Sequence, residues 1–315
     1  MAQGVLDVAF TAIEGDDTEY CTTFRRANRE EAKQLQLLTR SEEPWENLGM
    51  LAIKLAQIAS LPDERLEDVR AKEQNYAELV RSTGYEFGRQ LADAWCAAFV
   101  WIKRPPAKNT GRPQGPPSPP AEGEEGRSGG QTLNSQPSTQ PDGFDYPITN
   151  EVLRRLERNT HDASKWMREE IRRLADQYQF FHWYLAFPDV FQVPPAGQKP
   201  DNELCGWNGG FDVILGNPPW ERVKLQEKEW FVAHGREDIA NAPNAADRRR
   251  LIQALKKQDL TLYRKFVEDV RRAEGGSHLL RNSGLYPLTA RGDINLYAVF
   301  AEVMRKHLSP NGRVG

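Results

Sequence analysis

A segment rich in proline and glycine divides this chain of 315 residues. Residues 103–143 hold nine prolines and seven glycines in 41 positions, and Leu133 is their only large apolar residue. Such a composition cannot bury enough surface to offset the conformational entropy lost on ordering. We therefore expect a disordered insertion at 103–143, between an N-terminal part, 1–102, and a C-terminal part, 144–315.

Both parts are expected to be mainly helical. Apolar residues at spacings of three and four, such as Leu51, Leu55 and Ile58, predict a helix that follows Trp45. In the N-terminal part we expect further helices over 23–38, 62–82 and 85–102, of which the last is the most apolar and should be the most buried. In the C-terminal part helices are expected over 150–179, with a weak point near Asn159-Thr160, over most of 221–291, and over 295–308.

One segment predicts a buried β-strand. Residues 211–215 read FDVIL, which is short, rich in strand-forming residues and bounded by Gly210 and Gly216. Residues 313–315 resemble the first residues of another strand. The expected fold class is therefore α/β, with one clear strand, a C-terminal strand stub and large, mostly helical insertions.

The residues that directly follow this strand are Asn217-Pro218-Pro219-Trp220. Proline rings fix φ near −65° and leave carbonyl groups without a competing backbone donor. The Asn217 amide oxygen and the Pro218 carbonyl can then accept both hydrogens of one amino group. The indole of Trp220 offers a face for a planar base, and such stacking is worth about 1–3 kcal/mol. Ligands of α/β sheets bind beyond the carboxyl ends of strands, which is where this turn lies.

The sequence FDVILGNPPW resembles the (N/D)PP(Y/F/W) motif of amino-group DNA methyltransferases. Three neighbouring stretches, FHWYLAFPDVF, NPPWERVKLQEKEWF and YPLTARGDINLYAVFAEVMRKHLSPNGRVG, narrow the match. With them, the chain resembles the large adenine-specific methylases of type IIG restriction–modification and related phage-defence systems. The resemblance is strong over 178–315 and looser over 1–102.

This resemblance implies a partial Rossmann-like class I methyltransferase. It implies S-adenosylmethionine as the methyl donor, and the N6 of an adenine flipped out of double-stranded DNA as the acceptor. Carried over by position, Asn217 and Pro218 hold the target amino group, Pro219 belongs to the same catalytic turn, and Trp220 stacks on the adenine.

The cofactor motif of such enzymes, a glycine-rich turn similar to DPACGSG, does not occur in this sequence. No GxG at a strand end and no suitably placed acidic ribose ligand precede Phe211. We therefore expect an internal fragment of a larger methylase that does not bind S-adenosylmethionine measurably by itself. The missing upstream and downstream parts of the methylase are the expected protein partners.

Residues 221–291 carry 15 Lys and Arg against 10 Asp and Glu. Contact with DNA phosphates is one interpretation of this excess, and a solvated helical face is an equally weighted alternative. Lys224, four residues after the motif's indole, is the best single candidate for a DNA contact. The other candidates are Arg248, Arg249, Arg250, Lys256 and Lys257.

Composition narrows the remaining classes of protein. The net charge of −3 excludes a wholly basic nucleic-acid binder, and no apolar segment is long enough to span a membrane. Three scattered cysteines and five histidines without ligand spacing predict no disulfide framework and no metal site, so a cytoplasmic protein is expected. We interpret His182 as a buried structural histidine, and Asp293 and Asn295 as candidate caps of the last helix.

Two other functions remain open. The first is an NPP-type methylase that acts on a protein glutamine, where the aromatic residue would stack on the amide plane. The second is a catalytically inactive remnant that at most binds DNA or a partner chain, which the missing cofactor motif favours.

Overall fold

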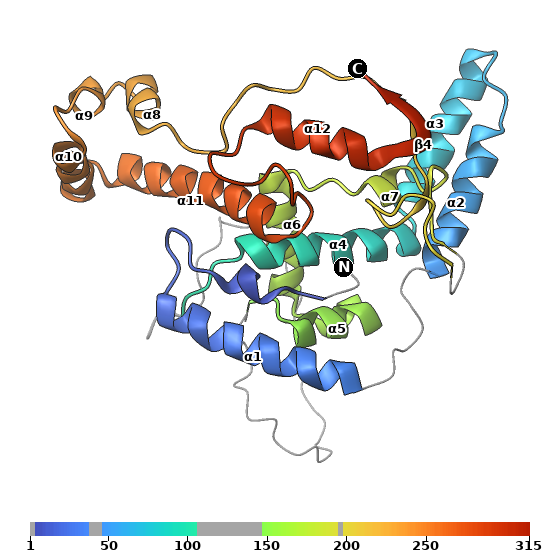
Figure 1. Ribbon diagram of the computed structural model, residues 1–315, viewed down its shortest axis with the longest axis horizontal. Coiled ribbons are helices and arrows are strands. Elements are labelled where there is room, and N and C mark those ends of the chain that lie inside the picture. Colours follow the sequence, from blue (N-terminus) through green and yellow to red (C-terminus); the bar gives the residue numbers. More distant parts are fainter. Residues whose placement is uncertain (1–3, 38–45, 106–146, 195–197) are drawn as a thin grey trace, which may run out of the picture.

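The computed structural model describes residues 4–37, 46–105, 147–194 and 198–315, and the expected insertion at 103–143 lies outside them except for 103–105. Helices dominate the described chain (Figure 1). The N-terminal elements are η1 (Asp7–Phe10), α1 (Thr18–Leu37), α2 (Glu46–Ala59), α3 (Leu66–Val80) and α4 (Thr83–Val100). After the insertion come α5 (Asn150–Arg158), η2 (Thr160–Asp162), α6 (Lys165–Tyr178), α7 (Trp183–Ala186), β1 (Phe191–Gln192), β2 (Asn208–Gly209) and β3 (Phe211–Ile214). The last elements are α8 (Glu227–Ala233), α9 (Glu237–Ala240), α10 (Ala245–Gln258), α11 (Leu260–Asn282), α12 (Leu296–His307) and β4 (Leu308–Val314).

Helix α4 lies at the centre of the main core, as its apolar sequence predicts. It runs between α1 and α5 on one side and α11 and α12 on the other (Figure 1). Its fully buried Phe99 and Val100 pack in one cluster with Phe10 of η1, Leu156 of α5 and Ile171 of α6. The two parts that the insertion separates in sequence therefore share a single core.

Buried amide groups join these two parts. The backbone N–H of Asn150, at the start of α5, donates to the side-chain oxygen of Asn28 in α1 at 2.9 Å. The Asn150 side chain accepts from the Val5 N–H at 2.7 Å and donates to the Val5 carbonyl at 3.1 Å. Because a buried polar group without a partner is costly, these bonds fix how α5 docks on α1.

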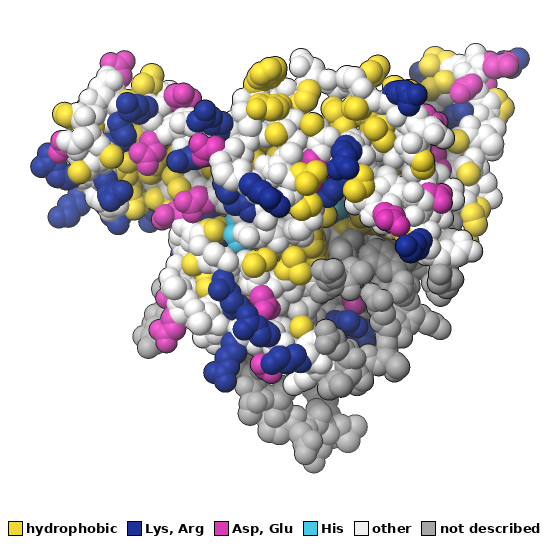
Figure 2. All heavy atoms as spheres, viewed as in Figure 1, with side chains coloured by type: hydrophobic (Ala, Val, Ile, Leu, Met, Phe, Trp, Pro, Cys, Tyr) yellow, Lys and Arg dark blue, Asp and Glu magenta, His cyan; other side chains and the backbone are white. Residues whose placement is uncertain are grey.

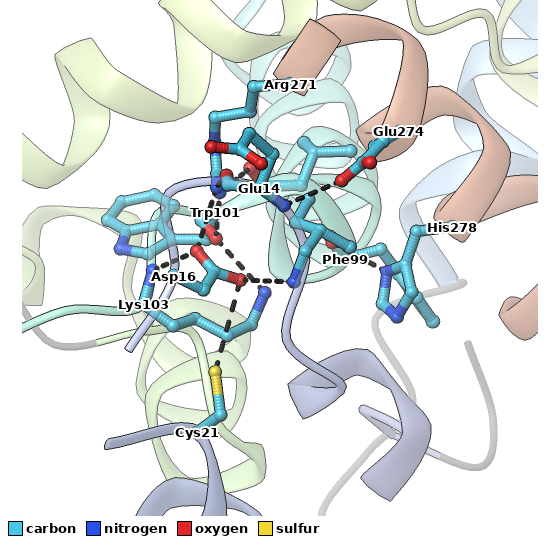
Figure 3. Close-up of polar contacts among 11 residues, drawn as sticks. Glu14, Asp16, Cys21, Phe99, Trp101, Lys103, Arg271, Glu274 and His278 are labelled. Atoms are coloured by element: carbon cyan, nitrogen blue, oxygen red, sulfur yellow. Dashed lines mark hydrogen bonds and ion pairs between the residues drawn. The ribbon is translucent and has the colours of Figure 1, made fainter. Parts of the chain in front are cut away.

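An ion pair joins Arg271 of α11 to Asp16 in the turn before α1, beside the C-terminal end of α4 (Figure 3). Nη1 of Arg271 lies 2.9 Å from Oδ1 of Asp16, whose side chain is fully buried. The same guanidinium donates to the carbonyls of Trp101 at 3.0 Å, Val100 at 3.3 Å, and Glu14. One cation thereby satisfies carbonyls that the end of α4 leaves without helical partners.

Lys103 corrects the start expected for the insertion. Its side chain is fully buried, its backbone N–H donates to Oδ1 of Asp16 at 3.0 Å, and its Nζ donates to the Trp101 carbonyl at 3.1 Å. Burial lowers the pKa of Lys103 to about 8, although the nearby Asp16 raises it. Composition assigned Lys103 to the insertion because the proline- and glycine-rich stretch begins there. Charged residues are rarely buried without a partner, and here Asp16 supplies the opposite charge.

A second core lies away from α4. Trp230 and Phe231 of α8 pack with Ile239 of α9, Leu255 of α10 and Phe266 of α11. Helix α11 is long enough, at 23 residues, to join this cluster to the main core, so that α8, α9 and α10 sit at one end of the molecule (Figure 1). The helix prediction for most of 221–291 is confirmed.

The strands form two small sheets. β1 pairs antiparallel with β2, and β3 pairs parallel with β4. Gly210 has φ +129°, and an added Cβ would lie 2.5 Å from the Ser309 backbone nitrogen, so only glycine lets β3 start this close to β4. Both predicted strands are confirmed, and β4 begins earlier than the expected stub.

The prediction that residues 211–215 are buried is wrong. The side chain of Phe211 packs against Phe187 and Phe191, but Val213 is 60% exposed and Leu215 is 78% exposed. Among the described residues, β3 has only β4 as a sheet neighbour. Figure 2 shows hydrophobic side chains gathered over the part of the surface that α12 and β4 occupy.

We predict that Arg271→Met destabilises the protein by about 3–5 kcal/mol, because it removes the ion-pair partner of the buried Asp16 carboxylate and the donor to the Val100 and Trp101 carbonyls. Urea unfolding followed by circular dichroism measures this change. Arg272→Met is the matched control, because Arg272 is 56% exposed and its ion pair with Asp269 contributes about 0–1 kcal/mol. Equal stabilities of the two variants would contradict the role given to Arg271.

Candidate functional site

The Asn217–Trp220 turn is an exposed loop that leaves the carboxyl end of β3. Neither the Asn217 side-chain amide nor the Pro218 carbonyl takes part in a hydrogen bond with the described residues. Trp220 is 81% exposed, an unusual degree for an indole. Asn217 and the Trp220 indole are therefore exposed on the surface, and Pro218 between them is half-buried.

A short backbone pairing fixes the chain that follows the turn. Val223 N–H donates to the Ile294 carbonyl at 3.0 Å, and Leu296 N–H donates to the Glu221 carbonyl at 2.9 Å. Arg222 and Asn295 form an antiparallel bridge between these two bonds. The segment 221–223 is thus attached to the residues that begin α12, although more than 70 positions separate them in sequence.

The two residues expected to cap the last helix have different roles. The Asn295 side chain accepts a hydrogen bond from the Tyr297 N–H at 3.4 Å and is the N-cap of α12. The carboxylate of Asp293 lies 3.8 Å from the Arg222 guanidinium, so it supports the backbone pairing beside the motif.

Glu302 is a buried carboxylate in α12 that was not among the residues expected from the sequence to have a role. It accepts hydrogen bonds from the N–H and the hydroxyl of Thr289 at 3.0 and 2.6 Å, and lies 3.8 Å from Nζ of Lys306. Burial alone would raise the pKa of Glu302, but the bonds from Thr289 and Leu288 and the charge of Lys306 hold it below its ordinary value. Glu302 therefore anchors the loop that leads to Ile294. The only signal for it in the sequence is the basic residue four positions later, Lys306, which can form an ion pair within the same helix.

The structure places the candidate DNA contacts in different settings. Lys224 and Arg249 are exposed and form no ion pair with the described residues. Lys256 is exposed, and its Nζ lies 5.1 Å from the centre of the Tyr263 ring. The side chain of Arg248 is only 12% exposed and lies 3.9 Å from Glu227, which makes it the least accessible of the four.

The remaining candidates, Arg250 and Lys257, are also exposed on α10. The Arg250 guanidinium lies 3.6 Å from the carboxylate of Asp247. Figure 2 shows many Lys and Arg side chains on the end of the molecule that α8, α9 and α10 form. The exposed basic residues of α10 and the Asn217–Trp220 turn therefore lie on different parts of the surface. Residues 221–226 connect the turn to α8.

His182 has the structural role expected of it. Its Nε2 lies 2.7 Å from Oδ1 of Asp93, and both side chains are almost buried. They line a groove of about 290 Å³ between α4 and α6. His182 adjoins the ring of Tyr184 and precedes the residues that pack on Phe211, which begins β3. The motif lies beyond the other end of that strand.

The described residues do not fit an S-adenosylmethionine site at the end of β3. A cofactor turn there needs a glycine whose open space a ligand can enter. Gly216 is the glycine at this strand end, and a Cβ added to it would lie 2.5 Å from Cε of Met304 in α12. Gly216 therefore packs against α12, and it stands alone at this strand end, without the further glycines of a glycine-rich cofactor turn.

Part of the chain matches a known protein family. Residues 138–272 match the family described as Eco57I restriction-modification methylase. The chain resembles methylases of restriction–modification systems. The resemblance inferred from the motif is thereby confirmed, and the matched residues include the Asn217–Trp220 turn. No curated protein and no solved structure matches the chain.

The structure is mixed α/β, mostly helical with small sheets, and this fits the methylase family that residues 138–272 match. No helix in the described ranges has the length and apolar character needed to cross a membrane. Within those ranges, no group of three or more His, Cys, Asp and Glu side chains is arranged to bind a metal ion.

We predict that this methylase-like chain shows no 1:1 binding of S-adenosylmethionine at micromolar affinity, because its sequence has no glycine-rich cofactor turn and no acidic ribose ligand before Phe211. Isothermal titration calorimetry of the full 315-residue chain tests this expectation. A saturable 1:1 isotherm in the micromolar range would show that other residues form a cofactor site.

Proposed function

We propose that the chain forms the acceptor-base half of an adenine-specific DNA methyltransferase of a restriction–modification or phage-defence system. The observation that carries this proposal is the exposed Asn217–Trp220 turn after a parallel-paired strand, within the residues that match the methylase family. The reaction is the transfer of a methyl group from S-adenosylmethionine to the N6 of an adenine in DNA.

The chain's own residues act on the acceptor base. The Asn217 amide oxygen and the Pro218 carbonyl accept the two hydrogens of the adenine amino group, which draws the nitrogen lone pair out of conjugation with the ring. Neither acceptor has a competing hydrogen bond among the described residues, so neither has to be released first. Such preorganised groups lower a barrier because they need no reorientation as charge develops.

Trp220 holds the flipped adenine. Removing a base from the duplex costs a few kcal/mol. Stacking on an aromatic side chain returns about 1–3 kcal/mol, which is comparable. The high exposure of Trp220 is consistent with this role, since a base can reach the indole without displacing protein atoms.

The methyl donor requires protein residues other than those described. In this proposal they belong to the rest of the methylase, whose strands extend the parallel sheet at β3 and β4. Parallel sheets are normally covered on both faces, whereas Val213, Leu215 and Val314 are largely exposed. These apolar side chains support a contact with the cofactor-binding part of the enzyme.

The exposed basic residues of α10, together with Lys224 before α8, contact DNA phosphates in this proposal. Lys224 lies four residues after Trp220 and is the candidate nearest to the base in sequence. Arg249 and Lys256 would contribute sequence-independent attraction that weakens as salt rises. Arg248 would contribute least, because its guanidinium is mostly covered and lies beside Glu227.

We predict different defects for Asn217→Ala and Trp220→Ala in the methylase assembled with its cofactor-binding part. Asn217→Ala should lower kcat about 10²–10³-fold with DNA affinity nearly unchanged, because its acceptor acts mainly in the transition state. Trp220→Ala should reduce extrusion of a fluorescent base analogue at the target position, and Trp220→Phe should restore most of it.

Single-turnover methylation and the fluorescence of the base analogue measure these two effects. Leu204→Ala, an exposed apolar change before β2, is a control for loss of exposed surface. Wild-type methylation by Asn217→Ala would refute the acceptor assignment. If Trp220→Phe were as impaired as Trp220→Ala, the indole would act through its N–H or its size.

A further inference from the structure

Tyr297, in the first turn of α12, is in ring contact with the motif's indole. The centres of the Trp220 and Tyr297 rings are 5.5 Å apart, and the ring planes are inclined at 43°. Tyr297 is itself 45% exposed, so more than half of the residue is covered by the protein. Its contact with Trp220 joins two surface side chains that are far apart in sequence.

The backbone sets the position of Tyr297 relative to Trp220. The pairing of 221–223 with 294–296 begins at the residue after Trp220 and ends at the residue before Tyr297. The ion pair between Arg222 and Asp293 closes one edge of this pairing. The two aromatic residues are therefore anchored immediately next to the same pair of hydrogen-bonded segments.

The distance between the two rings shows that Tyr297 contacts Trp220 directly and leaves no room for a base between them. Ring centres 4.5–7 Å apart are in direct contact, so no planar base fits between Trp220 and Tyr297. Since Trp220 remains 81% exposed, its other surface is open to solvent. A base can stack there while Tyr297 supports the indole from the side it contacts.

We propose that Tyr297 is a positioning residue that holds the Trp220 indole ready for the acceptor base. This inference rests on the proposed function of the turn and adds a residue outside the motif. A fully exposed side chain samples several rotamers, and fixing one on base binding costs entropy. Contact with Tyr297 restricts the indole beforehand, which strengthens stacking without any contact between Tyr297 and the base.

The first experiment tests the ring contact in the full chain without DNA. In protein labelled with 5-fluorotryptophan, the ¹⁹F resonance that disappears in Trp220→Phe belongs to Trp220. We expect Tyr297→Leu to shift this resonance and Tyr297→Phe to leave it nearly unchanged. Phe300→Leu is the matched control, because Phe300 lies on the same helix, is 41% exposed and has no ring contact with Trp220.

The second experiment measures stacking as the change of the Trp220 ¹⁹F resonance on titration with an adenine-containing single-stranded oligonucleotide. A matched oligonucleotide with an abasic site in place of the adenine gives the response that does not depend on the base. We expect Tyr297→Leu to weaken the base-dependent association about twofold to tenfold, the range of one aromatic contact. Tyr297→Phe should bind as the wild type does, and circular dichroism should show unchanged helical content in both variants.

The outcomes separate the two proposals. If the wild type shows a base-dependent shift and Tyr297→Leu shows the same affinity, the role of Tyr297 is refuted and the acceptor site stands. If the wild type shows no base-dependent shift, the acceptor site is refuted and the role of Tyr297 with it. An unchanged Trp220 resonance in Tyr297→Leu would refute the positioning contact itself.

Discussion

The contact between Arg271 and Asp16 determines how the C-terminal half of the chain joins the N-terminal half. Asp16 is fully buried and accepts from both Arg271 and the Lys103 backbone, so the turn before α1, the end of α4 and the middle of α11 meet at one carboxylate. Because α11 carries α8, α9 and α10 on its other end, this contact also fixes where the basic surface lies relative to the core. Removing one partner of a buried ion pair leaves an uncompensated charge, so the junction depends on both residues.

The candidate site depends on a different set of contacts. The loop from α11 to α12 is anchored by Glu302, and its last residues pair with the segment that follows Trp220. This arrangement supports the turn from α12 rather than from the sheet, of which only two parallel strands are formed by the described residues. The site is consequently ordered on one side and open on the other, where a base and the cofactor-binding part of a methylase can approach.

Much of the helical fold could be predicted from periodicity and from prolines and glycines. The buried character of α4 followed from its composition, and the break between α5 and α6 occurs where Asn159 and Thr160 interrupt the helix pattern. The exposure of Val213 and Leu215 could not be predicted, because an apolar strand indicates only that it suits burial, not which neighbours are present. The burial of Lys103 could not be predicted either, since it depends on Asp16, 87 positions earlier.

The motif could be recognised in the sequence because its four residues, 217–220, are adjacent. Tyr297 and Glu302 were not, because each acts through a contact between segments that only the fold brings together. Arg248 shows the reverse case, in which a basic residue with a suitable sequence context is largely covered by the structure.

Photo-crosslinking tests the central claim, that the Asn217–Trp220 turn receives a nucleic-acid base. A random-sequence oligonucleotide that carries 8-azidoadenine is irradiated with the full chain, and the modified peptides are identified by mass spectrometry. The account predicts that the main crosslink lies within residues 217–220 and that unmodified adenine-containing oligonucleotide competes it away. Crosslinks confined to the basic helices α8–α10 or to the groove between α4 and α6, with none in the turn, would contradict it.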